Sequence, residues 1–222
     1  MSGVRKVLCS IGCGPHAALL AVSGQSFRTY AEHHGYELEL RTEAPTIDRP
    51  VPWAKVPLIQ ELLLRFDLVL WIDADAAITD VSVDIADMLS EQDLMGLVAH
   101  VTPESRDPIP NSGVWILRSD PMIQEFLGEV WEATEYVDHK WWENAAELDR
   151  LGYQLEPEVC LDHPTAMSGR TRYLPTEWNC ISADQAPRSR IVHFPGRPLP
   201  ERLAGLVAAV ERLRDVGGAA SG

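Results

Sequence analysis

The chain has 222 residues, of which 45% are hydrophobic and 23% charged, which is the composition of an ordinary soluble globular domain. Its formal net charge of −14 and its pI near 4.8 argue against duplex nucleic acid or an anionic membrane as the main partner. No apolar run is long enough to cross a membrane and no signal peptide is apparent, so we expect the protein to be cytoplasmic.

The first quarter of the chain predicts two strands separated by a helix. Residues 4–11 are typical of a strand, and residues 16–34 predict a helix that ends at Gly35, a residue suited to the position after a helix. Residues 36–40 alternate apolar and acidic side chains and predict a half-buried second strand. After a proline-rich loop, the next helix should start near Lys55, because a proline two residues later suits a first helical turn.

The following strand has the most informative pattern in the chain. Residues 68–72 are continuously apolar, as in a strand buried on both faces, and they lead directly into Asp73 and Asp75. Two carboxylates at the end of a buried strand need a cation or hydrogen-bond donors to replace their lost hydration. Ligands of open α/β sheets bind beyond the carboxyl ends of the strands, and carboxylate oxygens suit Mg²⁺ or Mn²⁺. We therefore predict a metal site here, with helix-capping or solvent-facing aspartates as the alternative.

The remaining elements continue the alternation of strands and helices. A short helix is expected at residues 81–89, strands at 94–99 and 114–117, and helices at 122–135 and 141–151. This alternation favours an α/β fold with a mostly parallel central sheet flanked by helices. We expect one domain over residues 1–216, followed by a flexible tail over residues 217–222.

Six short motifs occur in a definite order along the chain. They are Trp-Ala-Lys-Val-Pro-Leu at 53–58, the strand with its Asp-Ala-Asp at 67–78, Asn-Ser-Gly-Val at 111–114, Trp-Trp-Glu-Asn-Ala-Ala at 141–146, Leu-Pro-Thr-Glu-Trp-Asn at 174–179 and Val-His-Phe-Pro-Gly at 192–196. In this order the set resembles the retaining GT-A glycosyltransferases. It is most similar to the family of α-galactosyl-, α-mannosyl- and α-xylosyltransferases, with glycogenin-like enzymes as more distant relatives. The resemblance extends from about residue 4 to residue 196.

The resemblance implies a GT-A fold and a metal-dependent glycosyltransferase. Such an enzyme would transfer a hexose or pentose from a nucleotide-diphosphate sugar, with UDP as the expected nucleotide, and would retain the anomeric configuration. Mn²⁺ or Mg²⁺ would be the cofactor. The acceptor stays open among a glycan, a natural product, a lipid-linked sugar and a protein side chain, and a homo-oligomer stays open as well. Front-face attack and double displacement are both compatible with the motifs.

The family's metal and phosphate contacts can be carried over by motif. Asp73 and Asp75 would be metal ligands from the DxD element, and His193 would be the third ligand. A metal between the two phosphates neutralises the charge that grows as the nucleotide diphosphate departs. After the histidine, Gly196 would let backbone N–H groups approach phosphate, and Arg197 would add a bidentate contact.

The other motifs would contact the donor and the reacting sugar. Lys55 resembles the family's lysine in Trp-x-Lys, which implies a place near the donor. A nearby anion would also offset the mildly unfavourable position of a cation at a helix start. The donor sugar hydroxyls would contact the segment Asn111, Ser112 and Gly113. The catalytic pair is carried over from the helix after Trp-Trp, where the family usually has Asp-Gln and this chain has Glu143 and Asn144. Trp141 and Trp142 would either both be core residues, the commoner place for aromatic side chains in a helix, or one of them, Trp142, would stack on a sugar ring.

Two other functions fit parts of this pattern. A haloacid-dehalogenase-like phosphatase also ends an apolar strand in Asp-x-Asp, although a Thr or Val usually stands where this chain has Ala77. The second alternative is a non-catalytic module that binds a nucleotide sugar without metal-dependent turnover.

Overall fold

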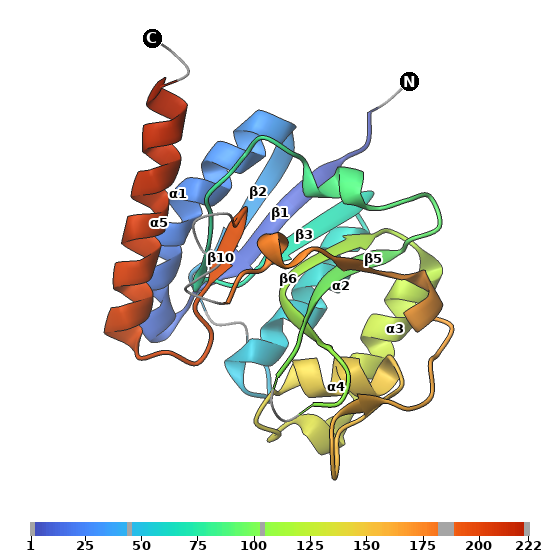
Figure 1. The fold of residues 1–222 in the computed structure, drawn as a ribbon. Coiled ribbons are helices and arrows are strands. Elements are labelled where there is room, and N and C mark those ends of the chain that lie inside the picture. Colours follow the sequence, from blue (N-terminus) through green and yellow to red (C-terminus); the bar gives the residue numbers. More distant parts are fainter. Residues whose placement is uncertain (1–2, 44–45, 103–104, 182–188, 220–222) are drawn as a thin grey trace.

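A six-stranded sheet, mixed but mostly parallel, forms the centre of the molecule (Figure 1). The structure, a computed structural model, describes residues 3–43, 46–102, 105–181 and 189–219. In spatial order the strands are β2 (Tyr36–Arg41), β1 (Lys6–Ile11), β3 (Leu68–Ile72), β6 (Ile109–Arg118), β5 (Met95–His100) and β9 (Thr171–Leu174). All run in one direction except β6, which is antiparallel to both β3 and β5. The predicted α/β fold with a mostly parallel sheet is confirmed.

Two small antiparallel sheets accompany the central one. Strand β4 (Ala76–Ile78) pairs with β10 (Ile191–His193), and β7 (Tyr153–Gln154) pairs with β8 (Cys160–Leu161). The sequence patterns did not predict these strands, because two or three residues are too few to establish a period of two.

Helices cover both faces of the sheet. Helices α1 (Ala17–His34) and α5 (Leu199–Ala219) pack side by side on one face, and α2 (Lys55–Leu63), α3 (Pro121–Glu132) and α4 (Glu143–Arg150) cover the other (Figure 1). No helix within the described part of the chain is long and apolar enough to cross a membrane. Short 3₁₀ turns complete the chain: η1 (Gly14–His16), η2 (Val51–Ala54), η3 (Ile85–Met88), η4 (Thr134–Tyr136), η5 (Ser168–Arg170) and η6 (Thr176–Trp178).

Strand β3 shows why the continuous apolar run was informative. Its side chains alternate between two separate cores, as the two-residue period of a strand requires. Val69 and Trp71 pack with α2, α3 and α4, whereas Leu70 and Ile72 pack with α1 and α5. Every residue of the strand is buried because both faces of this central strand are covered by helices.

Several predicted boundaries differ from the structure. The strand expected at residues 114–117 is longer and begins at Ile109. The helix expected at residues 81–89 is only the 3₁₀ turn η3, because Asp84 is bound by Lys6 Nζ at 2.7 Å and by the Tyr36 hydroxyl at 2.6 Å. These contacts tie the segment across the sheet and override its helical pattern. Helix α3 stops at Glu132, and α4 begins only at Glu143. Helix α5 includes residues 217–219 of the expected tail, and residues 220–222 lie outside the described residues.

Candidate metal and donor site

A tight turn after β3 brings the two aspartates together. The Asp73 N–H donates to the Gly113 carbonyl at 2.8 Å, and the Ala76 N–H donates back to the Asp73 carbonyl at 3.0 Å. In a straight strand, residues two apart would be separated by about 7 Å. The turn instead starts β4, which pairs with β10 so that His193 lies opposite Ala76. The Asp75 carbonyl accepts the next N–H, that of Phe194, at 3.1 Å.

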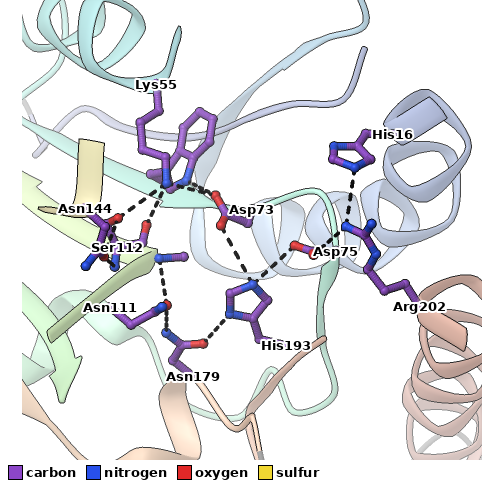
Figure 2. Close-up of polar contacts among 12 residues, drawn as sticks. His16, Lys55, Asp73, Asp75, Asn111, Ser112, Asn144, Asn179, His193 and Arg202 are labelled. Atoms are coloured by element: carbon purple, nitrogen blue, oxygen red, sulfur yellow. Dashed lines mark hydrogen bonds and ion pairs between the residues drawn. The ribbon is translucent and has the colours of Figure 1, made fainter. Parts of the chain in front are cut away.

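This pairing creates a cluster of three potential metal ligands, Asp73, Asp75 and His193, here called the metal cluster (Figure 2). His193 Nε2 lies 3.2 Å from Asp75 Oδ1 and 3.8 Å from Asp73 Oδ2. Ligand atoms around a Mg²⁺-sized ion lie about 3 Å apart, so small side-chain movements suffice to enclose one. Two carboxylates and an imidazole are a donor set suited to Mn²⁺ or Mg²⁺. The residues therefore fit a divalent ion.

A chain of hydrogen bonds orients His193. Asn111 Oδ1 accepts the Gly113 N–H at 3.0 Å and an Asn179 Nδ2 hydrogen at 2.8 Å. Because the Asn179 amide nitrogen faces Asn111, its oxygen faces His193 Nδ1, at 2.9 Å. Nδ1 must therefore donate, so Nε2 is the ring nitrogen that faces the two carboxylates and that would offer its lone pair once a metal ion replaces its proton. A metal-binding histidine needs this orientation.

Gly113 makes this arrangement sterically possible. A β-carbon at this position would overlap the His193 ring at Cε1 and would lie 2.8 Å from its Nδ1. His193 is only 3% exposed, so the ring has little room to move aside. The glycine of the Asn-Ser-Gly motif thus contacts the imidazole rather than standing in a simple turn before the strand.

Each carboxylate of the metal cluster has its second oxygen bound by a protein donor. Asp73 Oδ1 accepts from Lys55 Nζ at 3.2 Å and from Trp71 Nε1 at 2.7 Å, while Asp75 Oδ2 accepts from an Arg202 guanidinium nitrogen at 3.1 Å. Burial favours a raised pKa for Asp75, but His193 and Arg202 outweigh it and hold that pKa well below its usual range. Both aspartates are therefore oriented, and Asp75 is ionised before any ion arrives.

Lys55 links the metal cluster to Glu143. Its Nζ lies 2.8 Å from Glu143 Oε1, and Lys55 and Glu143 are each only 4% exposed. Burial disfavours the charged lysine, yet the carboxylates of Asp73 and Glu143 raise its pKa overall. Burial also raises the pKa of Glu143, and the neighbouring Lys55 charge opposes that effect. Glu143 Oε2 is buried and has no hydrogen-bond partner among the described residues.

Asn144 supports an irregularity in β6 instead of facing the metal cluster. The β5–β6 register jumps from Leu97–Trp115 to Val98–Asn111, so Ser112 has no partner on β5. The Asn144 Oδ1 accepts from the Ser112 N–H at 2.8 Å and from its hydroxyl at 2.9 Å, and Nδ2 donates to a backbone carbonyl of β6 at 3.2 Å. The amide thus determines the shape of the segment that leads to Gly113.

Trp142 lies immediately before α4 in an unusual backbone conformation. Its φ is 47°, a left-handed value that is strained for a bulky residue, and its side chain is 41% exposed. This strained, exposed residue directly precedes the buried Glu143.

The structure does not bring Gly196 and Arg197 to the metal cluster. Gly196 is exposed and has a φ of 69°, so it forms a left-handed turn after β10. An Arg197 guanidinium nitrogen donates to the Ile181 carbonyl at 3.4 Å, and its guanidinium lies over the Phe194 ring. Within the described residues, Arg202 is the arginine that contacts Asp75.

Four residues stand out among those around the site to which sequence patterns assigned no role. Asn179 was part of a motif but had no predicted function, and nothing in the pattern distinguished Arg202 in the first turns of α5. His100, whose Nε2 is buried without a partner among the described residues, has its pKa lowered to about 4 by burial and by His193. Glu147, one turn after Glu143, was detectable as an acid on the face that α4 buries.

Glu147 is the most unusual of the four. It is 1% exposed, and neither carboxylate oxygen has a hydrogen-bond partner among the described residues. Burial raises its pKa to about 8, helped by the charge of Glu143 and opposed by Lys55 and the Ser112 hydroxyl. The side chain is therefore mostly protonated at neutral pH, as a buried carboxyl without a full partner should be.

Comparisons with known proteins agree with this geometry. Residues 14–105 match the galactosyl transferase GMA12/MNN10 family. The chain is 35% identical over 147 residues to an uncharacterized alpha-1,2-galactosyltransferase of Schizosaccharomyces pombe, covering 50% of this chain and 39% of that protein. It is 30% identical over 137 residues to probable glycosyltransferase 3 of Oryza sativa subsp. indica, covering 57% of this chain and 28% of that protein. The chain thus spans well under half the length of these curated relatives.

Solved structures establish the fold. A glycosyltransferase involved in glycosylation of the major capsid of PBCV-1 superimposes with a TM-score of 0.67 at 16% identity, covering 91% of this chain and 98% of that one. The galactosyltransferase LgtC, in complex with donor and acceptor sugar analogs, superimposes with a TM-score of 0.58 at 13% identity. The match covers 92% of this chain and 96% of that one. These likenesses show a shared architecture. The chain has the GT-A fold, and residues 14–105 are similar to the galactosyl transferase GMA12/MNN10 family.

Proposed function

We propose that the protein is a divalent-metal-dependent glycosyltransferase that takes a hexose or pentose from a nucleotide-diphosphate sugar, with UDP as the nucleotide, and retains the anomeric configuration. The observation that supports this most is the metal cluster itself. Each aspartate has one oxygen bound by a protein donor and the other directed toward His193 Nε2. Such an arrangement at the carboxyl end of a central strand suits an ion that also binds an anionic ligand.

The residues around the proposed donor site have separate roles. Asp73, Asp75 and His193 would bind Mn²⁺ or Mg²⁺, and the bound ion would supply charge neutralisation for the departing diphosphate. Lys55 holds the Asp73 and Glu143 carboxylates in a fixed relation through contacts of 3.2 and 2.8 Å. Fixed charges of this kind lower a barrier because they need no reorganisation during the reaction.

We assign the sugar contacts to the β6 segment and to Trp142. Asn111 uses its oxygen for the chain to His193, so its Nδ2 hydrogens are available for a sugar hydroxyl. Ser112, buried beside Lys55, and Gly113 shape this wall of the site. The exposed Trp142 offers an apolar face to a sugar ring. Asn144 acts as a positioning residue, through its bonds to Ser112.

We assign the binding of the outer end of the diphosphate to Gly196 and Arg197, in the turn after β10. The exposed Gly196 has a left-handed backbone and no side chain to hinder a phosphate that approaches its N–H. Arg197 adds positive charge beside it. Its 3.4 Å bond to the Ile181 carbonyl is long, so little is lost if the guanidinium turns toward phosphate.

Glu143 has a different role in each of the two mechanisms that would retain the anomeric configuration. In front-face attack, the leaving phosphate oxygen accepts the acceptor's proton and Glu143 only positions and stabilises the sugar. In double displacement, Glu143 would be the nucleophile. Its burial and its 2.8 Å contact with Lys55 favour the first account.

Replacing Glu143→Gln should then lower turnover by roughly 10–10³-fold. A loss of about 10⁴-fold or more, or a glycosylated Glu143 detected by mass spectrometry, would support the nucleophile instead.

The two alternatives identified from the sequence have less support. A phosphatase nucleophile at Asp73 would need accessible oxygens, but Oδ1 already accepts from Lys55 and Trp71. The structural relatives described above are glycosyltransferases. A non-catalytic binding module would bind a nucleotide sugar without turnover, so it is distinguished by the assay below.

The central experiment measures nucleotide release from a panel of nucleotide sugars with and without Mn²⁺ or Mg²⁺. Asp75→Asn should lower release by roughly 100-fold or more, because it removes a charged ligand from the ion. The matched control is Asp48→Asn, the same change at a side chain that is 92% exposed, and it should retain activity. Full activity of Asp75→Asn, or in excess chelator, would contradict the proposal. Proton NMR of the freshly released sugar should show the donor's anomeric configuration.

A further inference from the structure

Arg202 lies on the far side of Asp75 from His193 (Figure 2). It belongs to the first turns of α5, and one guanidinium nitrogen contacts both Asp75 Oδ2 at 3.1 Å and His16 Nε2 at 3.3 Å. The side chains of Arg202 and Asp75 are only 17% and 13% exposed. The ion pair is therefore poorly screened by water, and each charge matters to whatever binds next.

An ion at the metal cluster and Arg202 would draw on the same carboxylate. Asp75 turns Oδ1 toward His193 and Oδ2 toward Arg202. A divalent ion on Oδ1 would therefore meet a carboxylate whose charge is already largely balanced, with a second cation nearby. Arg202 should weaken the binding of a bare metal ion for this reason.

The guanidinium also has unused hydrogen-bonding capacity. Its Nε is buried and lacks a partner among the described residues. A guanidinium has five N–H donors in a planar fork, which matches two oxygens of one phosphate well. A nucleoside diphosphate bound to the ion would bring such oxygens next to Arg202, along with negative charge to replace that of Asp75.

We propose that Arg202 is a positioning residue that exchanges partners. It pairs with Asp75 when no diphosphate is bound, and it pairs with the diphosphate when metal and nucleotide are bound together. The exchange makes metal and nucleotide binding cooperative, and because such coupling is reciprocal each ligand should tighten the other by the same factor. This inference rests on the proposed metal and nucleotide-diphosphate site.

The test measures Mn²⁺ affinity, from the electron paramagnetic resonance signal of free Mn²⁺, with and without saturating UDP. Arg202→Gln should bind Mn²⁺ alone about two- to fivefold more tightly than the wild type, the upper part of the range measured for single ion pairs. In the same variant, the factor by which UDP tightens Mn²⁺ binding should fall about tenfold or more. Arg202→Lys keeps the charge without the fork, so it should keep the wild-type affinity for Mn²⁺ alone.

The matched control is Arg28→Gln, which removes the same charge from an exposed position on α1, about 18 Å along the helix from His16. It should behave like the wild type in both measurements. The inference is overturned if Arg202→Gln does not tighten Mn²⁺ binding, or if it leaves the UDP effect unchanged, while the wild type binds both ligands. A wild-type chain that binds neither Mn²⁺ nor UDP would overturn the proposed function as well, so the two failures are distinguishable.

Discussion

Individual side chains in the site use their atoms for separate purposes. Asp73 and Asp75 each turn one oxygen to His193 and the other to a protein cation, and His193 turns Nδ1 to Asn179 and Nε2 to the aspartates. The two aspartates were predicted as ligands because carboxylates after a buried strand need partners, and His193 was predicted from the resemblance of its motif. The residues that orient them, Asn179 and Arg202, were not predicted because a side chain's partner depends on chain segments far away in sequence.

Glu147 leads to a prediction at the same scale. Its pKa of about 8 in the folded protein exceeds the ordinary glutamate value of 4.5. A raised pKa contributes stability below pH 4.5, and this contribution is lost as the pH rises toward 8. Relative to Glu147→Gln, the wild type should lose up to about 1.4 kcal/mol of unfolding free energy per pH unit across that window.

Urea unfolding of both proteins at several pH values between 4.5 and 8 measures this difference. Glu125→Gln, the same change at an exposed position of α3, should show a nearly constant difference from the wild type. A constant difference for Glu147→Gln as well would mean that the carboxyl is ionised and paired in the folded protein.

Among the elements, the β4–β10 pair and the irregularity in β6 build the site. The pairing places His193 opposite Ala76, and the register jump in β6 frees the segment from Ser112 to Val114 from β5. Neither feature has a sequence period, so neither was predicted, whereas the longer strands and the helices α1 to α4 could be recognised from their patterns. The short helix expected at residues 81–89 failed for a related reason, since contacts of Asp84 with other elements replaced its local pattern.

The close approach of β6 to β10 predicts opposite effects for two glycine replacements. Gly113→Ala should lower the unfolding free energy by about 1–3 kcal/mol and weaken Mn²⁺ binding, because the new methyl group would displace the His193 ring. Gly128 lies inside α3, and nothing lies within 4 Å of its hypothetical β-carbon. Gly128→Ala should therefore raise the unfolding free energy by about 0.5–1 kcal/mol. Urea unfolding and Mn²⁺ titration of both variants check this, and unchanged Mn²⁺ affinity in Gly113→Ala would argue against His193 as a ligand.

At the scale of the whole molecule, two apolar cores on opposite faces of the sheet support one polar edge. The cores contain α2, α3 and α4 on one face and α1 and α5 on the other, and the metal cluster lies where β3 leaves both. The chain has a formal net charge of −14, so an anionic donor is repelled by the molecule overall. Lys55 and Arg202 at the metal cluster, together with a divalent ion, would reverse that sign locally.

Ligand binding at this edge should therefore stabilise the entire fold. Mn²⁺ and UDP together, at about 100 times the dissociation constant, should contribute about 2.7 kcal/mol and raise Tm by roughly 5–10 °C for a chain of this size. Thermal unfolding with Mn²⁺ alone, UDP alone and both measures the effect. Asp75→Asn should lose most of the shift, whereas Asp48→Asn should keep it; a full shift in Asp75→Asn would place UDP at another site.

The amino-acid order alone was enough to predict the α/β fold and the buried strand before Asp73, and to propose a metal site at Asp73 and Asp75. These follow from local periodicity and from the solvation cost of charges after an apolar run, whereas His193 was added by the resemblance of its motif. The partners of those residues were decided by tertiary structure. Arg202 stands 127 residues from Asp75, and Asn179 stands 68 from Asn111. Such contacts depend on how strands pair and helices pack, which no local pattern encodes.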